Sequence, residues 1–434
     1  MQTRIGMQRQ RIEFNQPMGT RALSLTPFAP GDMGASLILD FQNQLYGVQA
    51  AGGNAPAPMQ FTDLVTFTRA SNAWYFNSAG VLTQASTDIP RFDYDAASLQ
   101  SKGLLIETAS TNMLLRSTDL SNSLWIKRGT CTVTTATGPL APDGTNTGNY
   151  VQGIAAPGSG DVYQSATAVS TTRYEPSIYL AKATSSGVIS LQNSESPAAG
   201  KWLVDISLLS TSYQRITRTH PAVTVVTEFT GYTNSKCGID ITRSSGAATL
   251  DIYAWGGQLE LGVFSSSTIL TTSATVTRSA DVASITPLTP WFNTSAGTLY
   301  ANYLLNSVGI NTPQAQLAAI SDSGSNSLAL RAKIATTGNS PIFVVGNGTT
   351  TTTLVSVNTN SGMMKAAGAY NASSSAECAN AEAPVTGATG YLDAGLASMG
   401  IGSLSGGQQL SGWLASIKFY PTQYNSAALQ ALTT

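Results

Sequence analysis

The stretch LDIYAW, from Leu250 to Trp255, alternates between apolar and other side chains with a period of two residues. Leu250, Ile252 and Ala254 would share one face of an extended strand, and the side chains between them would share the other face. A strand with one apolar face is typical of antiparallel sheets that cover a core on one side. We therefore predict a β-sandwich strand here.

Two later stretches repeat this period. In WLASIKF, residues 413–419, the alternation places Trp413 on the apolar face with Ile417 and Phe419. In LALRAKI, residues 328–334, the apolar side chains alternate with two basic ones. Similar short runs, separated by Gly, Ser, Asn and Pro clusters, follow residue 60 almost everywhere, and their spacing of roughly 8–12 residues favours a sandwich or jelly roll.

Helix signals are scarce. The best is NSAALQALTT at residues 425–434, where Asn425 or Ser426 can cap a helix of about two turns. The predicted class is therefore mainly β, with an N-terminal extended arm and two tandem antiparallel β-sandwich domains of jelly-roll or lectin-like type. The predicted boundaries are 1–60 for an attachment arm, 61–111 for a lead-in segment, 112–286 for the first sandwich and 291–434 for the second, with the break at TPLTP.

Charge is scarce in this chain of 434 residues. Only 10% are Asp, Glu, Lys or Arg, against about 25% in ordinary domains. Nucleic-acid binding needs clustered cations to neutralise phosphates, so that function is excluded. Membrane insertion is not expected either, because no run approaches the about 20 apolar residues of a spanning helix. With 42% hydrophobic residues the chain is not expected to be disordered.

The sequence offers little for catalysis or metal binding. His220 is the only histidine, which excludes zinc sites with several His ligands and makes a Ser-His-Asp hydrolase improbable. The cysteines Cys131, Cys237 and Cys378 have no metal-site spacing; buried thiols are expected, with a Cys131–Cys237 bridge as the alternative. We expect no cofactor and no enzymatic activity. The N-terminus lacks an apolar secretory segment, so synthesis in a cytoplasm is expected.

The N-terminal region is mildly basic. The stretch AAGGNAPAP at residues 50–58 is turn-rich, and such a segment usually becomes ordered only against a partner. We therefore interpret residues 1–60 as a particle-attachment arm, with a disordered tail as the alternative. The candidate attachment residues are Arg4, Arg9, Arg11 and Arg21. Beyond residue 281 the charge nearly vanishes, which suits a densely packed assembly of many copies.

An ordered set of phrases resembles a segment of tailed-bacteriophage virion appendage proteins, the head or tail fibres and spikes. It brackets a sandwich similar to carbohydrate-binding modules and spans roughly residues 61–286. The phrases are FTRASNAWYFNSAGVL (67–82), DIPRFDYD (88–95), KGLLIETASTNMLL (102–115), WGGQLELG (255–262) and TVTRSADVASI (275–285).

The last part of the chain resembles a laminin-G or concanavalin-like sandwich. GTLYANY (297–303) resembles its opening strand, and KAAGAYN (365–371), MGIGS (399–403) and the phrase at 410–433 resemble its closing half. Together the resemblances imply a virion-surface protein, made in the host cytoplasm, that contacts other capsid or tail proteins, forms a homotrimer and binds a host-surface glycan. The alternative is a decoration or cement protein of the particle without a ligand.

Glycan binding needs exposed aromatic rings. The alternation places Tyr179 opposite its apolar neighbours and places Tyr253 and Trp255 together, so these three rings are the candidate glycan-binding stripe if their strands are adjacent. The alternative is that this face packs against the lead-in segment or another subunit.

Paired carboxylates could indicate glycoside hydrolysis. The sequence offers Asp93 with Asp95, Glu195 with Asp205, and Asp251 with Glu260. Asp93 and Asp95 would share a strand face, where an ion pair with Arg91 or plain solvation is the favoured interpretation and a calcium site a minor one. No catalytic residue and no metal ligand is assigned.

Overall fold

The computed structural model is almost entirely β, which confirms the predicted fold class. Two helices occur among the described residues, α1 (Phe61–Leu64) and α2 (Ser426–Leu432), and neither is long and apolar enough to cross a membrane. The structure describes residues 28, 32, 34–49, 55–154, 160–166, 173–184, 187–192, 200–227, 236–240, 249–306, 314–322, 326–335, 338–347, 350–356, 362–388, 392, 395–403 and 409–434.

One sandwich, which we name the enclosing sandwich, packs two sheets around the largest apolar core. Its first sheet, the β32 sheet, has the order β3-β2-β1-β32-β23-β28-β29-β30, with β8 beside the start of β32 and β7 beside β8. The strands are β1 (Leu37–Asp40), β2 (Leu45–Gln49), β3 (Pro56–Met59), β7 (Phe92–Tyr94), β8 (Ser101–Ile106), β23 (Ala296–Leu305), β28 (Met364–Asn371), β29 (Ser375–Ala379), β30 (Val385–Gly387) and β32 (Gly412–Tyr420).

The second sheet of the enclosing sandwich, the β25 sheet, has the order β27-β26-β25-β24-β31-β22-β4. Leu328 and Leu330 enter the core from it, as the alternation in LALRAKI predicts. The strands are β4 (Thr66–Thr68), β22 (Val282–Ile285), β24 (Ala315–Ser321), β25 (Asn326–Ala335), β26 (Gly338–Asn347), β27 (Thr351–Val355) and β31 (Ser398–Ile401).

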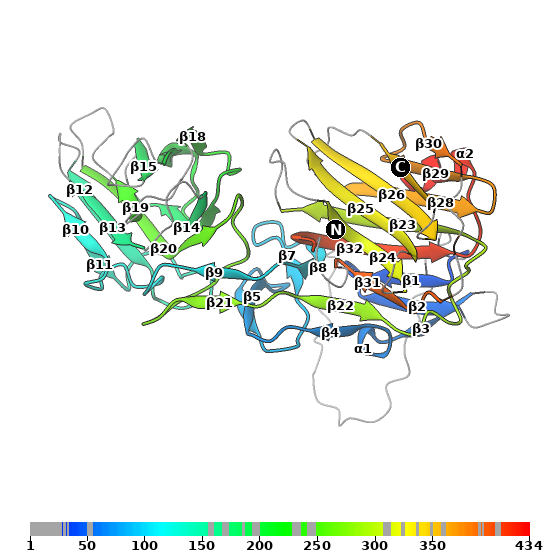
Figure 1. Cartoon of the computed structure of the whole chain (residues 1–434). Helices are drawn as coiled ribbons and strands as arrows, with labels where there is room; N and C mark the ends of the chain where they lie inside the picture. Colours follow the sequence, from blue (N-terminus) through cyan, green and yellow to red (C-terminus); the bar gives the residue numbers. More distant parts are fainter. Residues whose placement is uncertain are drawn as a thin grey trace, which may run out of the picture.

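The other sandwich, which we name the inserted sandwich, lies beside the enclosing one (Figure 1). Trp125 and Trp202 are buried in its core, together with the apolar side chains of LDIYAW. One sheet has the order β11-β12-β20-β14-β17, and the other β10-β13-β19-β15-β16-β18. The strands are β10 (Ile126–Arg128), β11 (Thr132–Thr135), β12 (Asn149–Ile154), β13 (Asp161–Ser165), β14 (Tyr174–Lys182), β15 (Val188–Gln192), β16 (Lys201–Asp205), β17 (Gln214–Ile216), β18 (Val223–Thr227), β19 (Lys236–Asp240) and β20 (Thr249–Leu261).

The two sandwiches are not arranged in tandem. The chain enters the inserted sandwich through β9 (Ser110–Asn112) and leaves it through β21 (Val276–Arg278), and these two strands pair antiparallel. The next strand, β22, then returns to the enclosing sandwich between β31 and β4 (Figure 1). The break predicted at residues 286–290 lies inside the enclosing sandwich, because both Ile285 and Trp291 belong to its core.

Residues 37–49 and 56–59 also differ from their predicted place in an attachment arm. In β1, Leu37 lies opposite Phe419 and Leu39 opposite Ile417 of β32. Both leucines are fully buried, as is Phe41 just beyond the strand. The short apolar LILD therefore supplies a strand of the enclosing sandwich, and the attachment residues Arg4, Arg9, Arg11 and Arg21 lie outside the described residues.

The C-terminal helix forms where predicted. The side chain of Asn425 caps α2 by accepting a hydrogen bond from the backbone N–H of Ala428 at 2.9 Å. Leu429 is buried against the β32 sheet, so the helix packs on a sheet face.

Candidate functional site

Five charged side chains meet in the interior between the two sandwiches, where the lead-in and the exit of the inserted sandwich come together. We name this group the ion cluster, and each member has at most 1% of its surface exposed. The phrases singled out in the sequence supply all of them: Arg69, Arg91 and Glu107 from the lead-in, and Arg278 and Asp281 from the exit.

Short distances join the cluster. Arg91 Nη2 lies 2.6 Å from Asp281 Oδ2 and 2.9 Å from Glu107 Oε2. Arg69 Nη1 lies 3.1 Å from Asp281 Oδ1, and Arg278 Nε lies 3.6 Å from Glu107 Oε2. Removing one partner of a buried pair leaves an uncompensated charge. The cluster therefore fixes the lead-in against the exit.

The electrostatics of Glu107 reflect this arrangement. Burial by itself raises the pKa of a carboxyl group, but the charges of Arg278 and Arg91 and the hydrogen bonds from Ser267 outweigh it and hold the pKa of Glu107 at about 2. Glu107 is thus ionised at neutral pH. It also lines the floor of a cleft, so the cluster supports that cleft directly.

The cleft lies between the inserted and the enclosing sandwich and has a volume of about 760 Å³. That size falls within the range of ligand pockets, roughly 300–1,000 Å³. Both aromatic rings and hydrogen-bonding side chains line the cleft. The partly exposed rings are those of Trp74, Tyr75, Phe76, Tyr213 and Trp413, and the buried Tyr179 also contributes to the lining.

Trp413 lies in the cleft because of an irregularity in β32. Asn302 of β23 lies opposite Ser416, but the next residue, Tyr303, lies opposite Leu414, so Ala415 is an extra residue. On the N-terminal side of this bulge the alternation is reversed, and Leu414 enters the core in place of Trp413. The prediction that Trp413 shares the core face of Ile417 is therefore wrong.

A polar network holds the Trp413 ring in place. Its Nε1 donates a hydrogen bond to Asp93 Oδ2 at 2.8 Å, while the backbone N–H of Phe76 donates to Asp93 Oδ1 at 2.8 Å. Lys102 Nζ lies 3.2 Å from Asp93 Oδ2 and 4.4 Å from the centre of the Trp413 ring. Asp93 therefore pairs with Lys102. The ion pair with Arg91 that the sequence suggested does not form, because Arg91 belongs to the ion cluster.

Asp95 does not work with Asp93. The pairing of β7 with β8 shifts register between Asp93 and Tyr94, and Asp95 lies beyond the strand in a turn. Its carboxylate accepts hydrogen bonds from the backbone N–H groups of Ala97 and Ser98, and the Ser98 bond is the main reason that its pKa is lowered. Asp93 and Asp95 thus have different hydrogen-bond partners and do not form a common site.

The opposite wall comes from β17 and the turn that follows it. Arg215 Nη2 donates to Ser177 Oγ at 3.0 Å, and its guanidinium lies 5.9 Å from the centre of the Tyr179 ring. His220 Nδ1 accepts a hydrogen bond from the backbone N–H of Ala222 at 3.2 Å, so the proton of the neutral ring resides on Nε2. Partial burial lowers the pKa of His220, which keeps the ring neutral at pH 7.

The predicted aromatic stripe exists but is largely covered. β14 and β20 are neighbours, Tyr179 lies opposite Trp255, and their ring centres are 5.6 Å apart. Tyr179 is only 2% exposed and Trp255 is 0% exposed, because the hairpin of β5 (Ala73–Phe76) and β6 (Leu82–Ala85) packs over them. Rings covered in this way cannot stack on a sugar. Tyr179 and Trp255 instead pack against the lead-in segment, which was the alternative interpretation of this face.

Tyr253 is the member of the stripe that stays partly exposed, outside the cleft. Its ring centre lies 5.4 Å from that of Tyr150, whose hydroxyl donates to Asp251 Oδ2 at 2.8 Å. A role for Tyr253 in glycan binding stays a prediction.

Of the remaining acidic pairs, Asp251 and Glu260 are engaged by different partners. Asp251 accepts hydrogen bonds from Tyr150 and Thr184, whereas Glu260 accepts bonds from Ser110 and Ser266. Asp205 caps a short turn, and Glu195 lies outside the described residues. In the described part of the chain, no three His, Cys, Asp or Glu side chains gather as a metal site.

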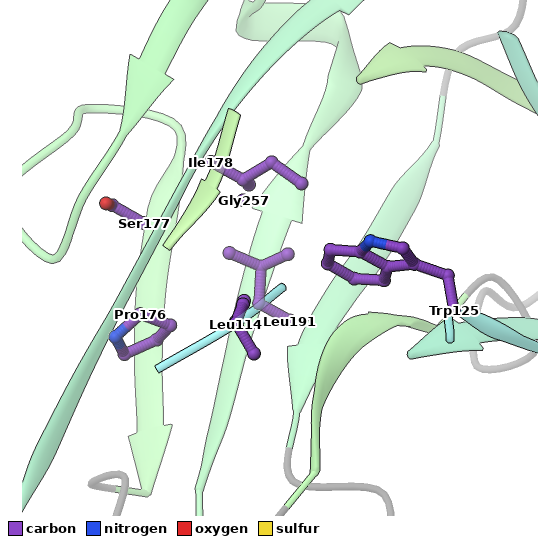
Figure 2. Close-up of a pocket in the computed structure, with 7 residues that line it drawn as sticks. All are labelled: Leu114, Trp125, Pro176, Ser177, Ile178, Leu191 and Gly257. Atoms are coloured by element: carbon purple, nitrogen blue, oxygen red, sulfur yellow. The ribbon is translucent and has the colours of Figure 1, made fainter. Parts of the chain in front are cut away.

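A second, much smaller cavity lies in the core of the inserted sandwich (Figure 2). Its volume is about 10 Å³, and Leu114, Trp125 and Leu191 contribute to its apolar lining. An apolar void at the lower limit for one water molecule is a packing gap and no ligand site.

Three solved structures illustrate what the fold is similar to. Mouse laminin alpha1 domains LG4-5 are 10% identical over 74% of this chain and 92% of that chain, with a TM-score of 0.24. A leech intramolecular trans-sialidase is 17% identical over 32% of this chain and 23% of that chain (TM-score 0.28). The binding domain of botulinum neurotoxin serotype D is 9% identical over 35% of this chain and 40% of that chain (TM-score 0.28).

This chain thus spans less than half the length of the trans-sialidase and of the neurotoxin domain. No protein-family model and no curated protein matches the sequence. With TM-scores this low, the likenesses assign neither a family nor a function.

Proposed function

We propose that this chain is a glycan-binding protein of a tailed-phage virion surface, a fibre or spike that takes its ligand in the cleft between the two sandwiches. The observation that carries the glycan part is the lining of that cleft. Sugars are bound by aromatic rings that cover their apolar faces and by amide, carboxylate and cationic groups that bond to their hydroxyls. Trp413, Asp93 and Lys102 supply one such set on the neighbouring strands β32, β7 and β8. Gln214 and Arg215 line the wall formed by β17.

The virion part rests on the resemblance of the ordered phrases between residues 67 and 285 to phage appendage proteins. We propose a binding role without catalysis, display on the particle surface, and a homotrimer in which several weak sites act together through their high effective concentration. Particle imaging that locates the density of this chain, together with mass photometry of the purified protein, tests these points. A stable monomer, or particles without this chain, would contradict them.

The test of glycan binding is a printed array of bacterial surface glycans probed with the full chain. We expect a defined group of glycans to be captured above background. Capture of none of them would refute the glycan part of the proposal and leave the virion part standing.

A decoration or cement protein without a ligand is the second candidate. The coverage of Tyr179 and Trp255 by the chain's own hairpin favours it, because the predicted stacking surface is used for internal packing. It predicts an empty array and a particle that loses stability when the chain is deleted.

A further inference from the structure

The charged side chains that line the cleft differ in whether a partner of opposite charge or a hydrogen-bond network already satisfies them. Asp93 is paired with Lys102, Asp95 accepts bonds from its own turn, and Glu107 belongs to the ion cluster. All three carboxylates that line the cleft are therefore already satisfied, and so is the charge of Lys102.

Arg215 is different. Its one hydrogen bond goes to a neutral hydroxyl, that of Ser177, and its guanidinium lies over the Tyr179 ring. Among the described residues no carboxylate pairs with it. A guanidinium presents five N–H donors in a planar fork that matches the two oxygens of a carboxylate. Arg215 thus brings an uncompensated charge and unused donors to the wall of the cleft.

The neighbouring groups on this wall are also donors. His220 carries its proton on Nε2, as a donor, because its other ring nitrogen accepts from the backbone N–H of Ala222. Gln214 uses its carbonyl oxygen to accept from the backbone N–H of Ser210 at 2.8 Å, so its amide N–H₂ is left for a ligand. Together with the guanidinium of Arg215, and with no carboxylate among the described residues of this wall, these donors favour an anionic oxygen group.

We propose that the cleft selects glycans that carry a carboxylate, such as uronic or sialic acid units, and that Arg215 binds this carboxylate. The stacking ring of Trp413 on the opposite wall would cover the apolar face of the same or a neighbouring sugar. This inference rests on the proposed function, because it names the ligand class of that site.

The experiment compares Arg215→Gln, which removes the charge, with Arg218→Gln, an arginine on the same segment that does not line the cleft. Both are probed on an array in which each carboxylated oligosaccharide is printed beside its neutral parent and a sulfated counterpart. We expect wild type and R218Q to prefer the carboxylated members, and R215Q to bind them about tenfold to a hundredfold more weakly, as for a charged hydrogen bond of about 1.5–3 kcal/mol.

Arg215→Lys keeps the charge but loses the planar fork, so it should recover part of the binding. Circular dichroism melts of all variants separate lost binding from lost folding. Equal capture of neutral parents by wild type, or unchanged binding by folded R215Q, would overturn this inference while leaving the proposed function intact. Preference for the sulfated members would overturn the assignment of the carboxylate. Capture of no glycan at all would overturn both.

Discussion

Arg91 and Asp281 lie 190 positions apart in the sequence, yet Nη2 of one is 2.6 Å from Oδ2 of the other and both side chains are fully buried. Arg91 belongs to the segment that leads into the inserted sandwich, and Asp281 follows the strand that leaves it. The same guanidinium also donates to the backbone carbonyl of Trp74 at 3.2 Å. The pair thus links the lead-in and the exit of the inserted sandwich to β5, whose Trp74 lines the cleft.

Asp281→Asn tests the cluster. The change keeps the shape of the side chain but leaves Arg69 and Arg91 without their shared countercharge, so the free energy of unfolding should fall by about 3–5 kcal/mol. Urea denaturation measures it. The matched control is Asp161→Asn, because Asp161 pairs with Arg128, whose side chain is 50% exposed; there we expect a loss of at most about 1 kcal/mol. Equal losses would mean that the cluster has no special role.

Deleting residues 1–60 tests the place of β1 in the enclosing sandwich. The deletion removes the fully buried Leu37, Leu39 and Phe41, whose burial is worth roughly 5–9 kcal/mol together, comparable to the stability of a whole domain. We expect the shortened chain to aggregate. Deletion of residues 1–27 keeps all three and should leave the melting temperature unchanged. A well-folded chain without residues 1–60 would restore the interpretation of that entire segment as an arm.

Gly103→Ala tests the docking of β8 on β32. Gly103 has a φ of +93°, and a Cβ there would lie 2.1 Å from the carbonyl oxygen of Leu414. Gly262 also has a positive φ, +145°, but a Cβ there would meet nothing within 4 Å. Both variants carry backbone strain, so we expect G103A to be less stable than G262A by roughly 2 kcal/mol or more. Thermal melts that coincide would refute this contact.

The buried Glu377 makes the stability of the fold decrease as the pH rises from about 4.5 to 8. Burial, with a contribution from the charge of Glu382, raises the pKa of Glu377 to about 8. The folded state keeps this proton between about pH 4.5 and 8 while the unfolded state releases it, so stability falls as the pH rises through that window. Glu377→Gln should remove this slope, and Glu382→Gln, a change at an exposed position, should keep it. Urea midpoints from about pH 5 to 9 decide it; a slope that persists in E377Q would contradict the assignment.

The sequence predicts strands better than it predicts their partners. Alternation correctly assigned the core face of LDIYAW and placed Tyr179 and Trp255 on the opposite face of their strands, because the period of a strand is a local property. It failed at Trp413, where one extra residue in β32 reverses the faces, and it failed at β1, whose partner lies more than 370 residues away. Both depend on contacts between distant segments.

The same limit applies to the candidate site. The phrases around Arg69, Arg91 and Arg278 were recognisable, but nothing in their spacing indicates that they share Glu107 and Asp281 in one buried cluster. The cleft was missed as well, since its walls come from β5, β8, β17 and β32. A basic residue on a short edge strand was the available signal for Arg215, and only the structure reveals that no acid pairs with it among the described residues.

The most direct test of the central claim compares Trp413→Ala with Tyr253→Ala on the glycans that wild type captures. Trp413 lies in the cleft, whereas Tyr253 belongs to the predicted stripe outside it. If the cleft holds the ligand, W413A loses at least about tenfold in affinity, as expected for a central aromatic contact, while Y253A binds as wild type does. Unchanged binding by folded W413A, with loss of binding by Y253A, would contradict this account and move the glycan to the open face of the inserted sandwich.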